Sequence, residues 1–161
     1  MQNGLYIVAT PIGNLGDLSP RAAETLANAD VIACEDTRIA KKLFALLNIS
    51  TAGKKFIVYQ NYNEEDEAQN IINLAVNDGK SIALVSDAGS PLISDPGYKL
   101  VRKAREQNVF VTVLPGCCAL ICALQLSGLP TNRFLFAGFI PNKDKARARS
   151  EERRVGKECR S

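Results

Sequence analysis

The sequence contains no histidine, and this absence limits the chemistry open to it. Without an imidazole, any proton transfer must use a carboxylate, lysine, tyrosine, cysteine or water. The five cysteines include no CxxC pair, and without histidine an ordinary zinc site is not expected, so we predict no metal. We interpret the cysteines as small, buried apolar side chains of a protein from a reducing compartment.

Long apolar segments are absent as well. No run approaches the roughly 20 residues that a membrane span needs. The first residues, MQNGLYIVATPIGN, have neither the basic start nor the long apolar stretch of a signal peptide. We therefore expect no membrane partner and a cytoplasmic location.

The last residues of the chain, RSEERRVGKECRS, are charged and show no coherent amphipathic period. The first eleven of them match the translation of a common sequencing-adapter read. We expect residues 149–161 to be adapter read-through and not native, the alternative being a solvated basic helix. The remaining chain has 15 basic and 14 acidic residues, so net charge gives no support to a nucleic-acid partner.

Apolar segments alternate with helical patterns along the rest of the chain. Continuous apolar runs predict buried strands at residues 5–9, 31–34, 56–59, 81–85 and 109–114. Ser19 and Pro20 are typical of the N-cap and first residue of a helix. Because continuous apolar strands suit a parallel sheet covered on both faces, we predict an α/β doubly wound fold, mostly parallel, with helices on both faces.

Two later segments read as helices with a defined apolar side. CCALICALQLSG predicts an apolar helix that Gly128 closes. In TRIAKKLFALLN the spacing predicts an inward side and an outward side: Ile39, Leu43 and Leu46 or Leu47 inward, Lys41 and Lys42 outward.

Doubly wound sheets bind ligands beyond the carboxyl ends of their strands. That rule selects loops of unusual composition: TPIGNLGDLS, EDTR, QNYNEE, SDAGSPLISDPG and PGCC. The first lacks both the dinucleotide fingerprint and the Walker sequence, which disfavours a pyrophosphate cofactor. In PGCC, free backbone N–H groups at the start of the next helix could meet a polar edge of a ligand. Nucleophilic catalysis by Cys118 is not expected without an activating histidine.

The EDTR loop places Glu35, Asp36 and Arg38 at the end of the second strand. In a structural interpretation, Asp36 caps the following helix and pairs with Arg38. In a functional interpretation, the carboxylate and the guanidinium face a cleft, where they accept a proton or hold a phosphate. Both interpretations are open at this point.

The stretch SDAGSPLISDPGY divides into two parts. Asp87 follows the fourth strand and is the better ligand candidate, while Gly89 lets the backbone approach a ligand closely. Asp95 and Pro96 are typical of the N-cap and first residue of the next helix.

Taken together, LYIVATPIGNLGDLSPRA, EDTR, ALVSDAGSPLISDPGY and SGLPTNRFLFAGFIP resemble the rRNA-modifying branch of the tetrapyrrole methylase superfamily, from about Leu5 to Pro141. The resemblance implies S-adenosylmethionine as cofactor, bound in a cleft between two α/β domains. It implies 2'-O-methylation of a cytidine ribose in small-subunit (16S) rRNA, with the rRNA or the 30S subunit as partner and a homodimer as the assembly.

The resemblance also assigns site residues. It implies cofactor contacts at seven positions: Pro11, Ile12, Asp87, Ser90, Cys117, Cys118 and Ala119. Within such a reaction, Asp36 is our candidate proton acceptor, and Arg38 our candidate for positioning phosphate or the hydroxyl. Two features depart from the family: Cys117-Cys118 replaces the usual Pro-Ser or Pro-Cys, and NYNEEDE lacks the usual histidine.

For the domains, the resemblance implies that residues 1–130 form the N-terminal methylase domain. Residues 131–148 would begin the link to a C-terminal domain that completes the cofactor pocket and is missing from this sequence. Two alternatives stay open. One is a methyltransferase of the same superfamily acting on a tetrapyrrole, and the other is a non-catalytic ligand-binding fragment.

Overall fold

The computed structural model describes residues 1–62, 64–143 and 147–148, so the predicted read-through segment 149–161 lies outside the described residues. The chain divides into two compact units, Met1–Leu129 and Pro130–Ser161. The strands and helices α1 to α5 all lie in the first unit. Among the described residues, none of the helices has the length and apolar character that crossing a bilayer requires.

The first unit contains a parallel β-sheet in the order β3-β2-β4-β1-β5. Its strands follow the predicted apolar runs closely: β1 (Gly4–Val8), β2 (Val31–Cys34), β3 (Lys55–Val58), β4 (Ser81–Val85) and β5 (Val111–Leu114). The central strands are buried along their whole length, which explains why their sequences are continuously apolar. The predicted doubly wound α/β fold is confirmed. Residues 133–139, which are also rich in apolar side chains, form no regular strand.

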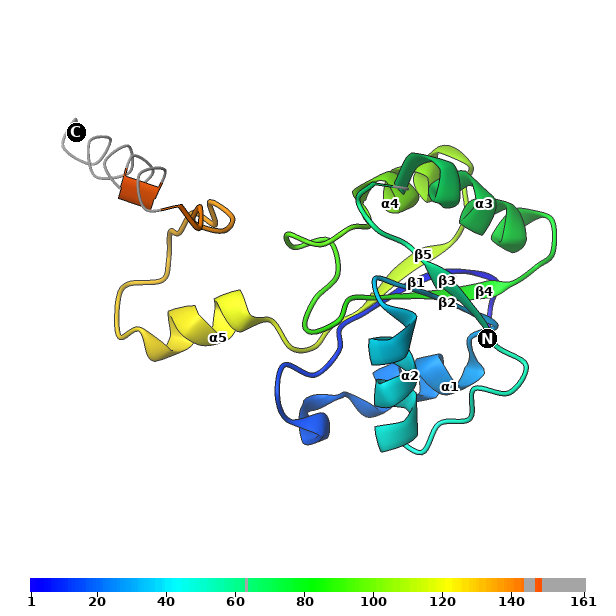
Figure 1. The fold of residues 1–161 in the computed structure, drawn as a ribbon, viewed down its shortest axis with the longest axis horizontal. Helices are drawn as coiled ribbons and strands as arrows, with labels where there is room; N and C mark the ends of the chain where they lie inside the picture. Colours follow the sequence, from blue (N-terminus) through cyan, green and yellow to red (C-terminus); the bar gives the residue numbers. More distant parts are fainter. Residues whose placement is uncertain (63, 144–146, 149–161) are drawn as a thin grey trace. The chain divides into compact units, whose positions relative to one another are not determined.

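Helices cover both faces of the sheet (Figure 1). One face carries α1 (Pro20–Asn28) and α2 (Thr37–Leu46), and the other carries α3 (Glu64–Val76) and α4 (Tyr98–Glu106). Alternate residues of one strand serve the two cores: Ile82 and Leu84 pack toward α3 and α4, and Ala83 and Val85 toward α1 and α2. A short 3-10 turn, η1 (Leu15–Asp17), precedes α1.

The chain reverses direction across the sheet between β1 and β4. After β1 it moves through α1 toward β2 and β3, whereas after β4 it moves through α4 to β5 on the opposite edge. The loops that leave the neighbouring strands β1 and β4 therefore turn to opposite faces. Such a switch point is where open parallel sheets bind ligands. The topology alone directs attention to the loops TPIGN and SDAGS.

The buried side of α2 differs from the predicted one. Ala40 and Phe44 are buried and Leu47 packs against the same core, whereas Ile39 and Leu46 are exposed. Small Ala40 lets the helix approach the sheet, and Phe44 then fills the space beside it. The lysines of this helix are exposed as predicted.

The start of α4 also differs from the prediction. Its N-cap is Gly97, not Asp95, and Pro96 precedes the helix instead of opening it. The amides of Gly97 and Lys99 donate to Oε1 of Glu64, at 2.9 and 3.2 Å. Glu64 is buried at the first turn of α3, so α4 is capped by a carboxylate from the neighbouring helix.

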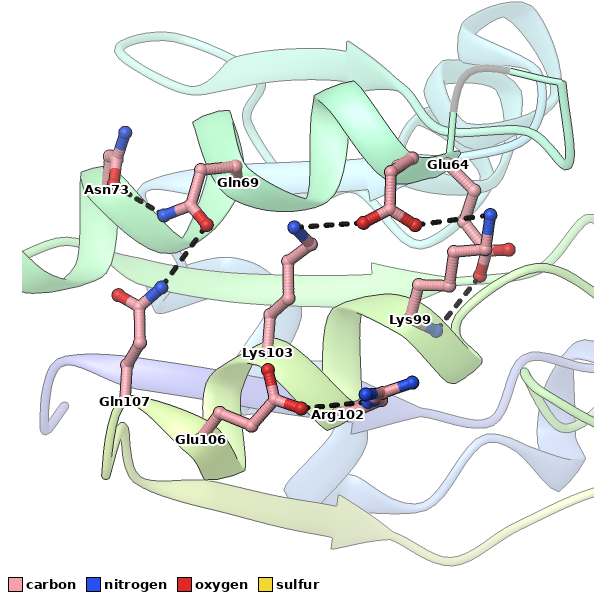
Figure 2. Close-up of polar contacts among 9 residues, drawn as sticks. Glu64, Gln69, Asn73, Lys99, Arg102, Lys103, Glu106 and Gln107 are labelled. Atoms are coloured by element: carbon pink, nitrogen blue, oxygen red, sulfur yellow. Dashed lines mark hydrogen bonds and ion pairs between the residues drawn. The ribbon is translucent and has the colours of Figure 1, made fainter.

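Polar contacts join the exposed sides of α3 and α4 (Figure 2). Nζ of Lys99 and of Lys103 lie 3.3 and 3.1 Å from the carboxylate oxygens of Glu65. One turn further on, Gln107 donates to Gln69 at 3.3 Å. These pairs are exposed, so each contributes little by itself, but together they hold the two helices in register.

The predicted apolar helix after PGCC is present as α5 (Ala119–Leu126), and Gly128 follows it with a φ of +69°. No residue of α5 is buried. Cys118 is its N-cap residue, and the Cys118 side chain makes no capping hydrogen bond.

Candidate functional site

The loops after β1 and β4 are joined where the two strands end. Thr10 N–H donates to the Gly89 carbonyl at 2.9 Å, and Gly89 N–H donates to the Thr10 carbonyl at 3.1 Å. The buried Thr10 hydroxyl donates to the Ser86 carbonyl at 3.2 Å. The polar backbone of Gly89 is therefore occupied by Thr10. Gly89 has no side chain to fill the space beside it, and its φ of +92° is a conformation that glycine adopts readily.

The loop after β5 is tied to the other two. Ser90 Oγ donates to the Cys117 carbonyl at 2.9 Å, and Cys117 Sγ donates to the Asp17 carbonyl at 3.6 Å. A Cβ added to Gly89 would lie 3.4 Å from Cγ2 of Ile12 and 3.8 Å from the Cys117 carbonyl oxygen. Ile12, Ser90 and Cys117, three of the predicted cofactor contacts, thus converge around Gly89.

A hollow of about 230 Å³ lies between the first loop and α2. It brings together Pro11 and Asp87, two further predicted cofactor contacts. The residues that line it are mostly apolar: Pro11, Gly13, Leu15, Ile39, Leu43 and Leu46, with Lys42 and Asp87. The exposure of Ile39 and Leu46 is explained by their place in this hollow.

Cys118 and Ala119 are less closely connected to these loops. Cys118 is half-buried and Ala119 is exposed at the first turn of α5. No side-chain hydrogen bond links either of them to the loops after β1 or β4 in the part of the chain that the structure describes. Their roles stay predictions.

The EDTR loop shows the contacts of the structural interpretation. Asp36 is the N-cap of α2, and its carboxylate accepts from the Arg38 amide at 2.8 Å. The Arg38 guanidinium donates to the same carboxylate, with Nη2 at 2.6 Å from Oδ2 and Nε at 3.1 Å from Oδ1. The hydrogen bonds from Arg38 lower the pKa of Asp36 to about 2. A carboxylate held so strongly in its charged form is a weak base at neutral pH.

Three other carboxyl groups lie at the same edge of the sheet, and their pKa values are raised, whereas the pKa of Asp36 is lowered. Burial, followed by the charge of Asp95, raises the pKa of Glu35 above its usual range. Burial also raises the pKa of Asp87 and of Asp95, and in Asp95 a hydrogen bond from Ser86 opposes this effect. The Asp87 amide points to Oε1 of Glu35 at 3.4 Å. Glu35 and Asp87 are therefore stronger bases than Asp36.

The cysteines do not behave as one class. Cys34 is buried as predicted, and burial together with the charge of Asp87 raises the pKa of its thiol to about 12. Cys117 and Cys118 are half-buried and Cys122 is exposed, so the interpretation of these three as buried apolar residues was wrong. Cys159 lies outside the described residues. Within the described ranges, no three cysteine or carboxylate side chains gather closely enough to hold a metal ion.

Two residues of this site were not among the predicted ones. Thr10 joins the loops after β1 and β4, and the signal for it was a polar residue directly after a buried strand. Glu35 is the first residue after β2, and it too could have been recognised as a polar residue that follows a buried strand. Both side chains lie at the carboxyl ends of strands, where open parallel sheets bind their ligands.

The fold is an α/β domain whose loops after β1 and β4 meet at a switch point of a parallel sheet. More specifically, the chain belongs to the tetrapyrrole methylase family: the family of Tetrapyrrole (Corrin/Porphyrin) Methylases matches residues 4–158. That match extends into the segment that we predict to be adapter read-through. The continuous gene sequence past Arg147 decides the origin of that segment.

The relatives support the same branch of the family. The chain is 55% identical over 143 residues to "Ribosomal RNA small subunit methyltransferase I" of Vibrio cholerae, covering 89% of this chain and 48% of that protein. The protein of the same name from Rickettsia prowazekii is 51% identical over 141 residues, covering 88% of this chain and 49% of the relative. The chain spans about half the length of the curated relatives it matches.

A solved structure with the same fold is the uroporphyrin-III-C-methyltransferase of Thermus thermophilus. It superposes with a TM-score of 0.59 over 82% of this chain and 55% of that one, at 20% identity. At this level of identity the likeness shows the fold alone.

Proposed function

We propose that the protein to which this chain belongs transfers a methyl group from S-adenosylmethionine to the 2'-oxygen of a cytidine ribose in small-subunit (16S) rRNA. The observation that carries the proposal is the 55% identity to a small-subunit rRNA methyltransferase over 89% of this chain. We propose further that it works in the cytoplasm as a homodimer, on the rRNA or on the 30S subunit.

The residues at the switch point fit S-adenosylmethionine, which combines a flat adenine with a positively charged sulfonium. Pro11 and Ile12 offer partly exposed apolar surface, and Gly89 leaves room beside Ile12 where a Cβ would come within 3.4 Å. The carboxyl groups of Glu35 and Asp87 supply negative charge at the same edge of the sheet. We assign the binding role to the seven residues predicted from the sequence: Pro11, Ile12, Asp87, Ser90, Cys117, Cys118 and Ala119.

When bound, S-adenosylmethionine supplies an electrophilic methyl group. The part of this chain is to hold the acceptor in line with that group, because alignment alone can account for a large share of the rate. The ribose hydroxyl must also lose its proton. Asp36 remains our proposed acceptor of that proton, with Arg38 positioning the phosphate or the hydroxyl, and Glu35 is a second candidate because its pKa is raised instead of lowered.

The test of the reaction uses the complete protein. It is incubated with 30S subunits and S-adenosylmethionine carrying a labelled methyl group, and the methylated nucleoside is identified after digestion. Labelled 2'-O-methylcytidine in small-subunit rRNA supports the proposal. Methyl transfer to a uroporphyrinogen instead of RNA would show the tetrapyrrole alternative to be right.

Calorimetry tests the second alternative, a non-catalytic ligand-binding fragment. S-adenosylmethionine is titrated into the present chain and into the complete protein. Binding by the complete protein alone supports a cofactor pocket shared between two domains. Equal binding by both would mean that residues 1–161 suffice.

The proton acceptor is tested by three variants in single-turnover methylation. Asp36→Asn keeps an oxygen that can cap α2 but cannot take a proton, whereas Asp36→Ala removes both functions. A large loss of rate in Asp36→Asn, with unchanged binding of cofactor and RNA, supports Asp36 as the base. If Asp36→Asn is as active as the unmodified protein while Glu35→Gln is not, the base is Glu35 and Asp36 serves as a cap.

A further inference from the structure

The segment that contains α2 and β3 carries charge of one sign. Residues 37–62 include five lysines and arginines and no acidic residue, although the chain without its last residues is almost neutral. The net charge of the whole chain does not reveal this local excess of positive charge. Three of these five residues, Arg38, Lys41 and Lys42, lie on the helix that starts at the predicted catalytic loop EDTR.

Three of the four basic residues of α4 offer a comparison, because they form ion pairs with nearby acids. Lys99 and Lys103 lie beside Glu65, at 3.3 and 3.1 Å. Arg102 lies beside Glu106 at 2.8 Å (Figure 2). The contacts to Glu65 join α4 to α3, and the Arg102–Glu106 pair lies within α4. Most of the positive charges of α4 therefore form ion pairs within this domain.

The lysines of α2 are different. Lys41 and Lys42 are both exposed, and within the residues that the structure describes neither takes part in an ion pair. Lys41 Nζ lies 5.4 Å from the centre of the Phe56 ring, which holds its charge at the surface without neutralising it. Arg38 forms a pair with Asp36, but its own side chain is 89% exposed.

Arg38 is a neighbour of both lysines on the helix surface, three positions from Lys41 and four from Lys42, and the two lysines lie on either side of it. We call Arg38, Lys41 and Lys42 the α2 basic face. Lys42 also lines the hollow that contains Pro11 and Asp87. The α2 basic face therefore borders the proposed cofactor site through Lys42.

We propose that the α2 basic face is a docking surface for the phosphates of the RNA backbone. Phosphates held there place an adjoining ribose at the hollow beside Pro11 and Asp87. This inference rests on the proposed function, and it adds where on this domain the RNA strand runs. Contacts to phosphates fix position and register without reading sequence, so we assign the α2 basic face to positioning.

The strength of such contacts depends on salt in a way that can be counted. For a single strand, each phosphate contact changes the slope of log affinity against log salt concentration by about 0.7. A double variant, Lys41→Gln with Lys42→Gln, should therefore lower the slope by about 1.4 and weaken binding several-fold at low salt. Both side chains are exposed, so folding should be unaffected.

The experiment measures binding of a fluorescent single-stranded RNA to the complete protein over a series of NaCl concentrations. The control is Arg105→Gln, which removes an exposed arginine from α4 in the opposite helix layer. Arg105→Gln should leave the slope unchanged. Both the α2 double variant and Arg105→Gln should unfold at the same thermal midpoint as the unmodified protein. A fall in slope confined to the α2 variant supports the inference.

Two results are distinguishable. If the unmodified protein methylates rRNA but the α2 double variant has the same slope as Arg105→Gln, the inference is overturned and the proposed function stands. If no RNA is methylated but the slope still falls in the α2 variant alone, the docking surface stands and the proposed function fails.

Discussion

Glu64 provides the most direct test of how this fold is held together. Its buried carboxylate accepts from the amides of Gly97 and Lys99, at 2.9 and 3.2 Å, and so caps a helix to which it does not belong. Replacing it by alanine leaves two amides at the start of α4 without their acceptor. Hydrogen bonds to charged groups contribute about 1.5–3 kcal/mol each, and lost caps cost about 0.5–2 kcal/mol.

We therefore expect Glu64→Ala to lower the free energy of unfolding by about 2–3 kcal/mol. With a urea dependence of about 2 kcal/mol per molar, the unfolding midpoint falls by about 1 M or slightly more. Glu64→Gln keeps an oxygen acceptor but loses the charge, and it should show a smaller loss. The measurement is equilibrium urea unfolding followed by far-UV circular dichroism.

The matched control is Asp66→Ala, which removes an exposed carboxylate from the same first turn of α3. It tests whether any acid near the start of that helix matters to the same degree. If Glu64→Ala and Asp66→Ala differ by less than about 0.5 kcal/mol, the range of ordinary surface substitutions, the capping argument is refuted.

Two further predictions concern close packing and burial. Gly4→Ala should destabilise the protein by about 2–4 kcal/mol, because its φ is +145° and a Cβ would lie 2.5 Å from the Phe110 carbonyl oxygen. Gly53→Ala, where φ is +74° and nothing lies within 4 Å, should cost only about 1 kcal/mol in the same urea unfolding. At pH 8, an alkylating reagent followed by peptide mass spectrometry should label Cys122 and leave buried Cys34 unlabelled. Because burial raises the pKa of Cys34 from 9 to about 12, its contribution to stability is present below pH 9 and is lost as the pH rises toward 12. Equal labelling of the two thiols in the folded protein would contradict the burial of Cys34.

The strands and their order of appearance were predictable because each buried strand of a parallel sheet must be apolar throughout. The site loops followed from the same rule, since they are the polar segments at the carboxyl ends of those strands. The cap of α4 was not predictable in this way. Asp95 and Pro96 have the right residue types beside the helix, but the acceptor comes from Glu64, more than 30 positions away in the sequence.

The two interpretations of Asp36 show a second limit of sequence reasoning. Its place after β2 fits both a cap and a base, and only the geometry shows that its oxygens are taken up by Arg38. Which side of α2 faces the core was ambiguous in the sequence for a similar reason. Ile39 and Leu46 have the apolar character of core residues, but they line a hollow at the surface and not the interior.

The loop from Ser86 to Gly97 is fastened at its start by Thr10, in its middle by Cys117 and at its end by Glu64. Within it, Leu92 and Ser94 are held at positive φ angles of 72° and 66°. The conformational entropy of this segment is thus given up when the protein folds and not when a ligand arrives. A ligand that meets such a loop loses less of its binding free energy to ordering the protein, and the same substitution that loosens a fastening point would weaken affinity without removing a single contact to the ligand.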